Sequence, residues 1–478
     1  MSSENIIEKE TDPEDLISYL KEEIPLEDMR DYASPQRIES IDFVKGFAMI
    51  FIIICHSTLF WFDKDWIFLN GMVYSVLDIL GPSLFVFLSA LSVIFSIRRK
   101  KGKLPEKVIR ARIFSRGISI MAIGVLFNIV GLSVVRPDIP FPMNLWGWNI
   151  LMFIGFSQIA SYYALKLKKL LRALIGVAII LISPSLRMYL YVEQNSSLLI
   201  FILHFIITSP TPELTLLPWL AICFISTIFG EILYETMIKG TEEAYWHLVQ
   251  QFMLWGIILL VIGLITGWQL YTPKTLPESE YPHLRLYTIM NQQDYYKFPG
   301  MPAFLIRGTI GNMFYNMGAA LIIIAICFYL IDIKKKDNQF TSMVIYYGKV
   351  SLSLFLIHFI FLPIFVGQFS IIYMPFIVVA YIGFLGFLMY IWNEYGNGFG
   401  SPEWFMIQIG RVGQKTGEKV KEEVVKTEEF ITKEIKKTEV FITKEIKKTE
   451  DFITKETKKI KEKTKELRKK DQQQQNEG

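Results

Sequence analysis

The chain has little charge and little cysteine for its length. Only 20% of its 478 residues are charged, whereas 52% are hydrophobic. This composition argues against an ordinary soluble or disordered chain and favours a polytopic membrane protein. The three cysteines, Cys55, Cys223 and Cys327, all lie in apolar runs, so we expect neither a disulfide framework nor a metal site. The net charge of +4 combines an acidic N-terminal tail with a basic C-terminal one, and no nucleic-acid partner is predicted.

The first 36 residues also lack the basic start and apolar middle of a cleavable signal, so we expect the first hydrophobic span to direct insertion. Crossing the hydrocarbon takes about 20 mostly apolar residues in a helix. About ten segments meet this requirement and predict an all-α fold, a polytopic bundle of transmembrane helices. They are 43–62, 73–97, 113–135, 145–165, 170–186, 214–234, 248–270, 310–331, 350–367 and 371–392. The shorter run Leu198–Thr208 cannot span alone and predicts a re-entrant or interfacial segment.

Basic residues gather in alternate connections, which predicts the orientation through the positive-inside rule. They fill the links before the third span (98–112), before the fifth (166–172) and before the ninth (334–336). We therefore expect a multi-pass protein of the cell membrane with these links and both termini in the cytosol. The polar segment Thr272–Arg307 is expected outside.

Ionisable residues inside apolar spans are candidates for function, because burying a charge is costly. His56 lies about 21 Å beyond Asp42 along the first span, in the outer half of the bilayer. An imidazole there can take up and return a proton near neutral pH, although a packing histidine bonded to a neighbouring carbonyl is the alternative. Asp78 falls near the same level and is either the carboxylate that orients His56 or a charge exposed near the outer surface.

His358, on the ninth span, is a second candidate for catalysis or substrate contact, with structural hydrogen bonding as the alternative. Arg112 and Arg116 lie one helical turn apart at the cytosolic start of the third span. Paired guanidinium groups suit phosphate binding, and anchoring at anionic lipid headgroups is the alternative. Arg116 lies deeper in the apolar run, where burial would require a partner. The sequence Gly81-Pro82-Ser83 predicts an opened or kinked helix in the second span.

Several motifs occur in a characteristic order between residues 37 and 410. They are RIESIDFVKG at 37–46 followed by His56, GPSLFVFL at 81–88, the R-x-x-x-R pair Arg112 and Arg116, LPWL at 217–220, YGKVSL at 347–352 followed by His358, and GSPEW at 400–404. In this combination the chain resembles the membrane-bound acyltransferases related to heparan-alpha-glucosaminide N-acetyltransferase.

The resemblance implies transfer of an acyl group, often acetyl, from cytosolic acyl-CoA to a sugar or envelope acceptor on the outer side of the lipid bilayer. It also implies that His56 acts as the base or acyl carrier and that Arg112 and Arg116 bind the CoA phosphates. The animal lysosomal member of this family looks to use a histidine in its first outer loop, whereas residues 61–71 of this chain contain none. The identity of the acceptor therefore stays open.

The C-terminal tail repeats an eleven-residue unit that begins at Lys426, Lys437 and Lys448. Eleven residues make about three helical turns, so the tail predicts a long amphipathic helix. It would either lie on the inner leaflet or form a coiled coil with itself or a partner. We divide the chain into an acidic tail (1–36), an acyltransferase domain (37–410) and the repeat helix (411–478). A transporter of a polar or lipid-linked solute is the alternative function, and a scaffold that recruits partners through the tail is a third.

Overall fold

The computed structural model divides into two units, Met1–Gln408 and Ile409–Gly478. The described residues are 38–63, 73, 75–98, 106–135, 145–208, 215–271, 301–336, 338–396, 401 and the single positions 436, 444, 447, 455 and 458. Four parts of the chain that were given predictions are not among the described residues. They are the acidic tail, Arg37, residues 272–300 of the predicted extracytosolic segment and most of the repeat helix. The five single positions in the second unit are helical.

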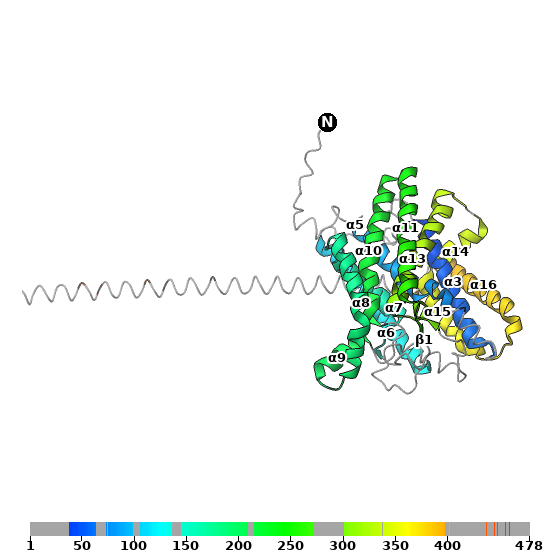
Figure 1. The fold of residues 1–478 in the computed structure, drawn as a ribbon, viewed down its shortest axis with the longest axis horizontal. Coiled ribbons are helices and arrows are strands. Elements are labelled where there is room, and N and C mark those ends of the chain that lie inside the picture. The colour runs from blue at the N-terminus through cyan, green and yellow to red at the C-terminus, as the bar shows by residue number, and fades with distance from the viewer. Residues whose placement is uncertain are drawn as a thin grey trace, which may run out of the picture. The chain divides into compact units, whose positions relative to one another are not determined.

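The first unit is a bundle of helices (Figure 1). They are α3 (Glu39–Trp61), α5 (Pro82–Arg98), α6 (Glu106–Val135), α7 (Ile150–Ala164), α8 (Lys169–Val192), α9 (Leu198–Ile207), α10 (Leu216–Lys239), α11 (Glu242–Thr266), α13 (Ile310–Phe328), α14 (Gln339–Lys349), α15 (Ser351–Phe361) and α16 (Met374–Gly396). A turn of 3-10 helix at Asp78–Leu80 precedes α5. Strands β1 (Leu270–Tyr271) and β2 (Met301–Pro302) form a short antiparallel pair.

Eight of the described helices are long and apolar enough to cross a membrane, and one bent helix pair raises the number to nine. The predicted all-α polytopic fold is therefore confirmed. The fourth predicted span, 145–165, differs: its helix, α7, begins only at Ile150 and has 15 residues. The Asn149 side chain caps α7 by accepting from the Met152 N–H, which leaves residues 146–149 outside the helix.

The ninth predicted span, 350–367, is not a single straight helix. The chain bends by 84° between Gln339–Lys349 and Ser351–Phe365. Helix α14 is held against α3 by a close contact between backbones, because a Cβ added at Gly46 would collide with the Val344 carbonyl oxygen and the Gly348 nitrogen. Since α14 is fixed there, the turn at Val350 is what directs α15 toward the far half of α3.

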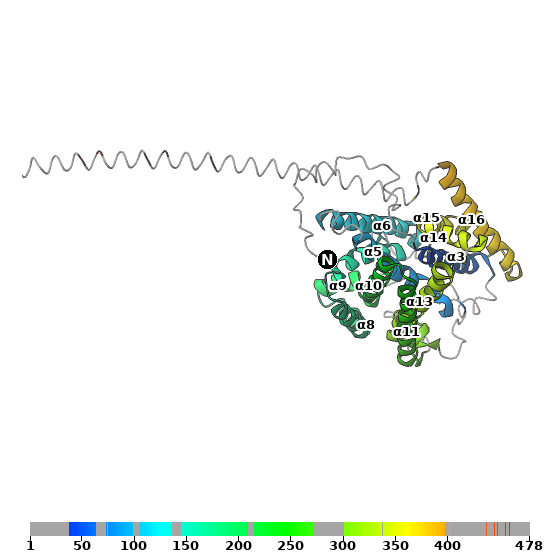
Figure 2. The same ribbon diagram turned by 90° about the horizontal axis from the view of Figure 1, so that it is seen from above.

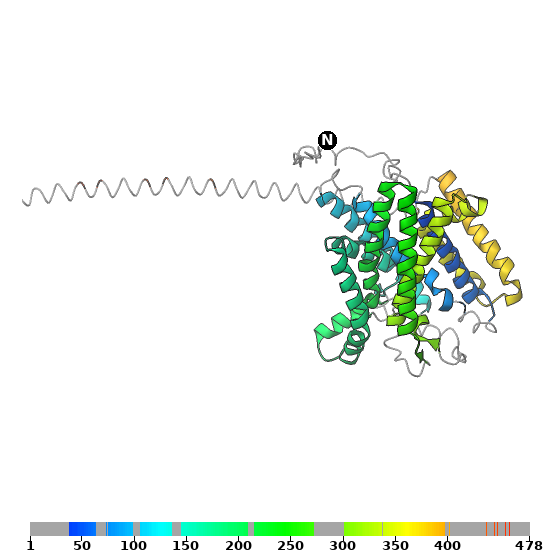
Figure 3. The same cartoon turned by 45° about the horizontal axis from the view of Figure 1, so that its top comes forward.

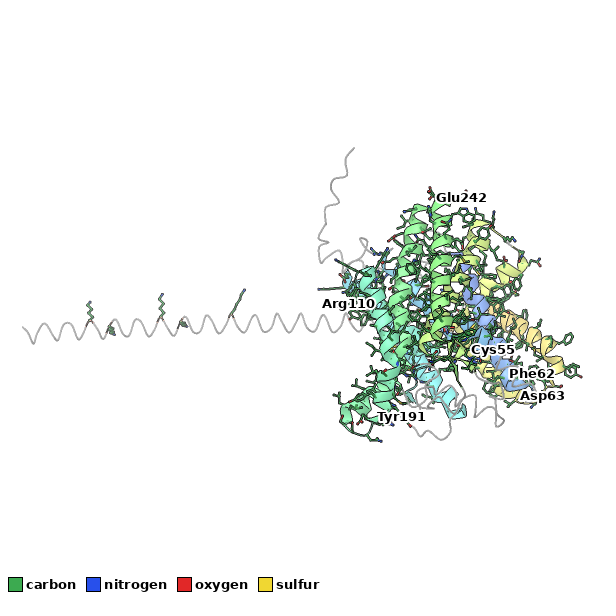
Figure 4. All side chains as sticks on the ribbon, in the orientation of Figure 1. Cys55, Phe62, Asp63, Arg110, Tyr191 and Glu242 are labelled. Carbon is green, nitrogen blue, oxygen red and sulfur yellow. The ribbon has the colours of Figure 1, made fainter. Side chains whose placement is uncertain are left out.

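The bundle has two ends, which we name after residues labelled in Figure 4. At the Glu242 end, Glu106 at the start of α6 pairs with Lys166 after α7 at 3.1 Å, and the Ser40 N–H donates to Asp332. At the Asp63 end, the Trp61 indole N–H donates to the Leu362 carbonyl at 2.9 Å. The first helix, α3, runs from the Glu242 end to the Asp63 end.

Helix α3 lies inside the bundle and contacts α5, α13, α14, α15 and α16. Figures 2 and 3 show α16 at one edge of the bundle and α8 with α9 at the opposite edge. The apolar core continues from α3 through α5 and α10 to α7. A side chain on the inner face of α3 is therefore shielded by several other helices.

Candidate active site

Two of the predicted histidines meet inside the bundle. His56 comes from α3, five residues before the helix ends, and His358 comes from α15. The Nδ1 atom of His56 lies 2.9 Å from the Nε2 atom of His358, although the two residues are 302 positions apart in the sequence. Their rings are stacked, with centroids 5.2 Å apart and planes within 4° of parallel. The bend at Val350 is what makes this contact possible.

The hydrogen bonds of the pair determine where its protons lie. The Nδ1 atom of His358 is 3.0 Å from the Leu354 carbonyl oxygen. A carbonyl only accepts, so in neutral His358 the proton sits on Nδ1 and the Nε2 atom carries the lone pair. The His56 Nδ1–H must then be the donor to His358. This arrangement leaves the lone pair of neutral His56 on Nε2, where it can act as a base.

Aromatic side chains enclose the histidine pair. His358 is fully buried and His56 is half-buried. Phe359 packs on both rings, and Phe127 of α6 packs on Phe359 with a centroid distance of 4.9 Å. The Tyr381 hydroxyl donates to the His358 backbone carbonyl at 2.7 Å, which fixes α15 against α16. In the described part of the chain, no three His, Cys, Asp or Glu side chains are grouped so that they could hold a metal ion.

Asp78 is buried, but its partner is an arginine. Both carboxylate oxygens accept from the Arg307 Nε–H, at 2.9 and 2.8 Å, and Nη2 of Arg307 donates as well. Asp78 was predicted to hold the His56 ring, whereas in the described contacts the Nδ1 atom of His56 bonds to His358. Arg307 lies within electrostatic range of His56, so the ion pair stands near the histidine pair without bonding to it in the described contacts.

Sequence reasoning gave Arg307 no function, since the residue closes a long polar segment expected outside the membrane. The available signal was its position three residues before the apolar helix α13. A polar network continues from this point. The Gly308 N–H donates to Asn312, which accepts from Asn316, and Asn316 in turn donates to Ser83 at 2.8 Å. The network ties the start of α13 to the start of α5.

Arg112 and Arg116 both lie on α6, near its start at the Glu242 end. Arg112 is half-buried and Arg116 is exposed, so the burial expected for Arg116 is not found. Eleven residues beyond Arg116 on the same helix, about 16 Å away, Phe127 reaches the aromatic wall of the histidine pair. Because eleven residues make about three turns, Arg116 and Phe127 share one face of α6.

A second group of charged side chains, at the Glu242 end, is not predicted from the sequence. Glu231 of α10 accepts from Arg98 of α5 at 2.6 Å and from Arg172 of α8. The sequence shows Glu231 as a lone acid within an apolar span, which is a signal in itself. The sequence places Arg172 only in the basic link 166–172 before the fifth predicted span.

The fold and the described contacts together show a helical membrane protein with a shielded, hydrogen-bonded pair of histidines. The family model described as heparan-alpha-glucosaminide N-acetyltransferase, catalytic, matches residues 37–268. This region, which carries His56, Asp78, Arg112 and Arg116, is therefore similar to that family of membrane acetyltransferases, and the resemblance is confirmed. His358 and Arg307 lie beyond the matched region. No curated protein matches the chain.

Proposed function

We propose that the protein moves an acyl group, acetyl in the first instance, from acyl-CoA bound at the Glu242 end to a sugar-like acceptor at the Asp63 end. The observation that carries this proposal is the hydrogen-bonded pair of His56 and His358, because it leaves a basic nitrogen on His56 within a family of acetyltransferases. The basic links at the Glu242 end favour a cytosolic position for that end. Both chain termini would then be cytosolic in a multi-pass protein of the cell membrane.

The chemistry follows from the free Nε2 atom of His56. This atom accepts the proton of an acceptor hydroxyl or amine while the acceptor oxygen or nitrogen attacks the thioester carbonyl. As the tetrahedral centre collapses, the carbon–sulfur bond breaks and the CoA thiolate takes the proton from His56. His358 offsets the positive charge that develops on His56 by accepting its Nδ1–H, as the third member of a catalytic triad does.

Arg112 and Arg116 are the proposed contacts for the CoA phosphates. They begin the helix that carries Phe127 to the histidine pair, so one rigid element would connect the donor end with the site of transfer. In this proposal the segment 411–478 is accessory to catalysis, whether it lies on the inner leaflet or associates with another helix.

The test is transfer of labelled acetyl from acetyl-CoA by the full chain in liposomes, with glucosamine and N-acetylglucosamine as acceptor probes. We expect His56→Ala to reduce turnover by about a hundredfold or more, since general-base catalysis typically contributes that much. The matched control is His247→Ala, because His247 is exposed on α11 and its one ion pair among the described residues is with Glu243, at 3.6 Å. Full transfer by the His56→Ala variant would contradict the mechanism.

A further inference from the structure

Arg172 is a buried cation on α8, a helix most of whose residues face outward. The leucines beside it on α8, Leu170, Leu171 and Leu174, are exposed. The buried residues of α8 form a single stripe, and Gly176 in this stripe allows α8 to approach Ile225 of α10 closely. Arg172 begins the stripe and is only 1% exposed. Its guanidinium group therefore lies between helices.

Among the residues that the structure describes, the charges around Arg172 do not balance. Arg172 and Arg98 both donate to Glu231, which is itself buried. Two guanidinium groups and one carboxylate leave one positive charge. The next acid on α10, Glu235, already pairs with Lys169 at 3.1 Å. An uncompensated charge in such a place is costly, so the group is suited to an additional anion.

The hydrogen-bonding capacity of Arg172 points the same way. Its Nε and Nη1 atoms are buried and have no acceptor among the residues that the structure describes. Buried N–H groups nearly always have a hydrogen-bond acceptor. The free-energy cost of burying a donor without an acceptor is larger for a charged donor than for a neutral one. Two of the three guanidinium nitrogens therefore lack an acceptor among the described residues.

We infer that Arg172, Arg98 and Glu231 form a phosphate-binding subsite at the Glu242 end. Guanidinium groups bind phosphate through short, charge-assisted hydrogen bonds. The Arg98 side chain is 40% exposed and pairs with the buried Glu231 carboxylate. It therefore places a positive charge where a phosphate can first contact the protein. Arg172 lies about 4.5 Å along α8 from its first residue, Lys169, so the subsite is within one turn of the end of that helix.

Two ligands share this phosphate chemistry. One is the CoA portion of the acyl donor, an assignment that rests on the proposed function, and the other is the headgroup of an anionic phospholipid. The subsite is distinct from Arg112 and Arg116, which lie on α6. The proposed subsite uses a buried arginine, Arg172, whereas Arg116 of the other pair is exposed.

The experiment measures binding of CoA and of pantetheine, which lacks the phosphates, to the full chain by calorimetry. We expect Arg172→Gln to weaken CoA binding by about tenfold to a hundredfold, as loss of charge-assisted hydrogen bonds does, and to leave pantetheine binding unchanged. Lys169→Gln is the matched control. It removes a neighbouring cation whose pair with Glu235 is exposed, so the affinity for CoA should change by less than about threefold.

A second arm measures retention of phosphatidylglycerol by the same variants in native mass spectrometry. Loss of lipid with unchanged CoA affinity assigns the subsite to the headgroup, and unchanged binding of both overturns the proposal. If Arg172→Gln does not fold, Arg172→Lys replaces it and should weaken binding less, since it retains the charge without the planar group. A chain that binds CoA through Arg172 yet transfers no acetyl group would refute the proposed function and leave the subsite standing.

Discussion

The proposed base, His56, depends on a residue from another helix. His56 keeps a lone pair on Nε2 because its Nδ1–H is donated to His358, and His358 can accept because the Leu354 carbonyl holds its own proton on Nδ1. In the proposed mechanism a second histidine does what a carboxylate does in the serine protease triad. His358 is a positioning residue in this scheme, and only His56 meets the substrate.

We expect His358→Leu to lower kcat by about a hundredfold to ten-thousandfold, the range seen when the orienting member of a triad is lost. KM should change little, because His358 makes no contact with substrate in this mechanism. The measurement is steady-state acetyl transfer at several acceptor concentrations. In His358→Gln the side-chain carbonyl can still accept from His56, so part of the rate should return.

A purely structural role for His358 would give a different pattern. His358 is fully buried and its ring packs on Phe355 and Phe359, so either variant can lower thermal stability. Stability loss alone would not separate kcat from KM and would not favour Gln over Leu. Equal turnover in the two variants, or a kcat for His358→Leu within about threefold of the wild type, would refute the positioning role.

At the scale of the helices, apolar runs predict where most spans lie but not where they break. From the sequence, residues 146–149 are predicted to be part of a span, but in the structure the helix begins only after Asn149. The indole N–H groups of Trp146 and Trp148 donate instead to two backbone carbonyls of α9, those of Phe205 and Ile206. Such breaks depend on partners distant in the sequence. The same holds for the site: single residues suggested His56 and His358, but only the bend at Val350 brings them into contact.

The contact between α3 and α14 carries a prediction about packing. A Cβ at Gly46 would meet the backbone of α14, whereas a Cβ at Gly383, on the exposed face of α16, would meet nothing within 4 Å. We expect Gly46→Ala to destabilise the fold by about 1–3 kcal/mol through overpacking. Gly383→Ala should be neutral or slightly stabilising, because alanine favours a helix over glycine.

Thermal unfolding of the two variants in the same detergent measures the difference. Because α14 leads directly into α15, Gly46→Ala should also reduce acetyl transfer by disturbing the position of His358, while Gly383→Ala should retain it. Equal melting temperatures for the two variants would show that the backbones of α3 and α14 do not approach as closely as the structure indicates.

For the whole molecule, the proposed function requires the two ends of the bundle to face different compartments. Cations gather at the Glu242 end, where Lys107, Arg110, Lys166 and Lys169 lie around the starts of α6 and α8. The loop between α8 and α9 lies at the other end, next to Tyr191, as Figure 4 shows. Exposed positions are available at both ends, so the orientation can be measured directly.

We expect an impermeant maleimide to label Asn195→Cys, in the exposed loop after α8, on intact cells. Glu242→Cys, at the exposed start of α11, should react only after the membrane is opened, because the basic end should remain in the cytosol. The parent chain sets the background, since Cys55 and Cys223 are buried and Cys327 is half-buried. If Glu242→Cys is labelled on intact cells and Asn195→Cys is not, the orientation of the protein is opposite to the one expected here. The arginines proposed to bind phosphate would then face away from cytosolic acyl-CoA, and the proposed direction of transfer would be wrong.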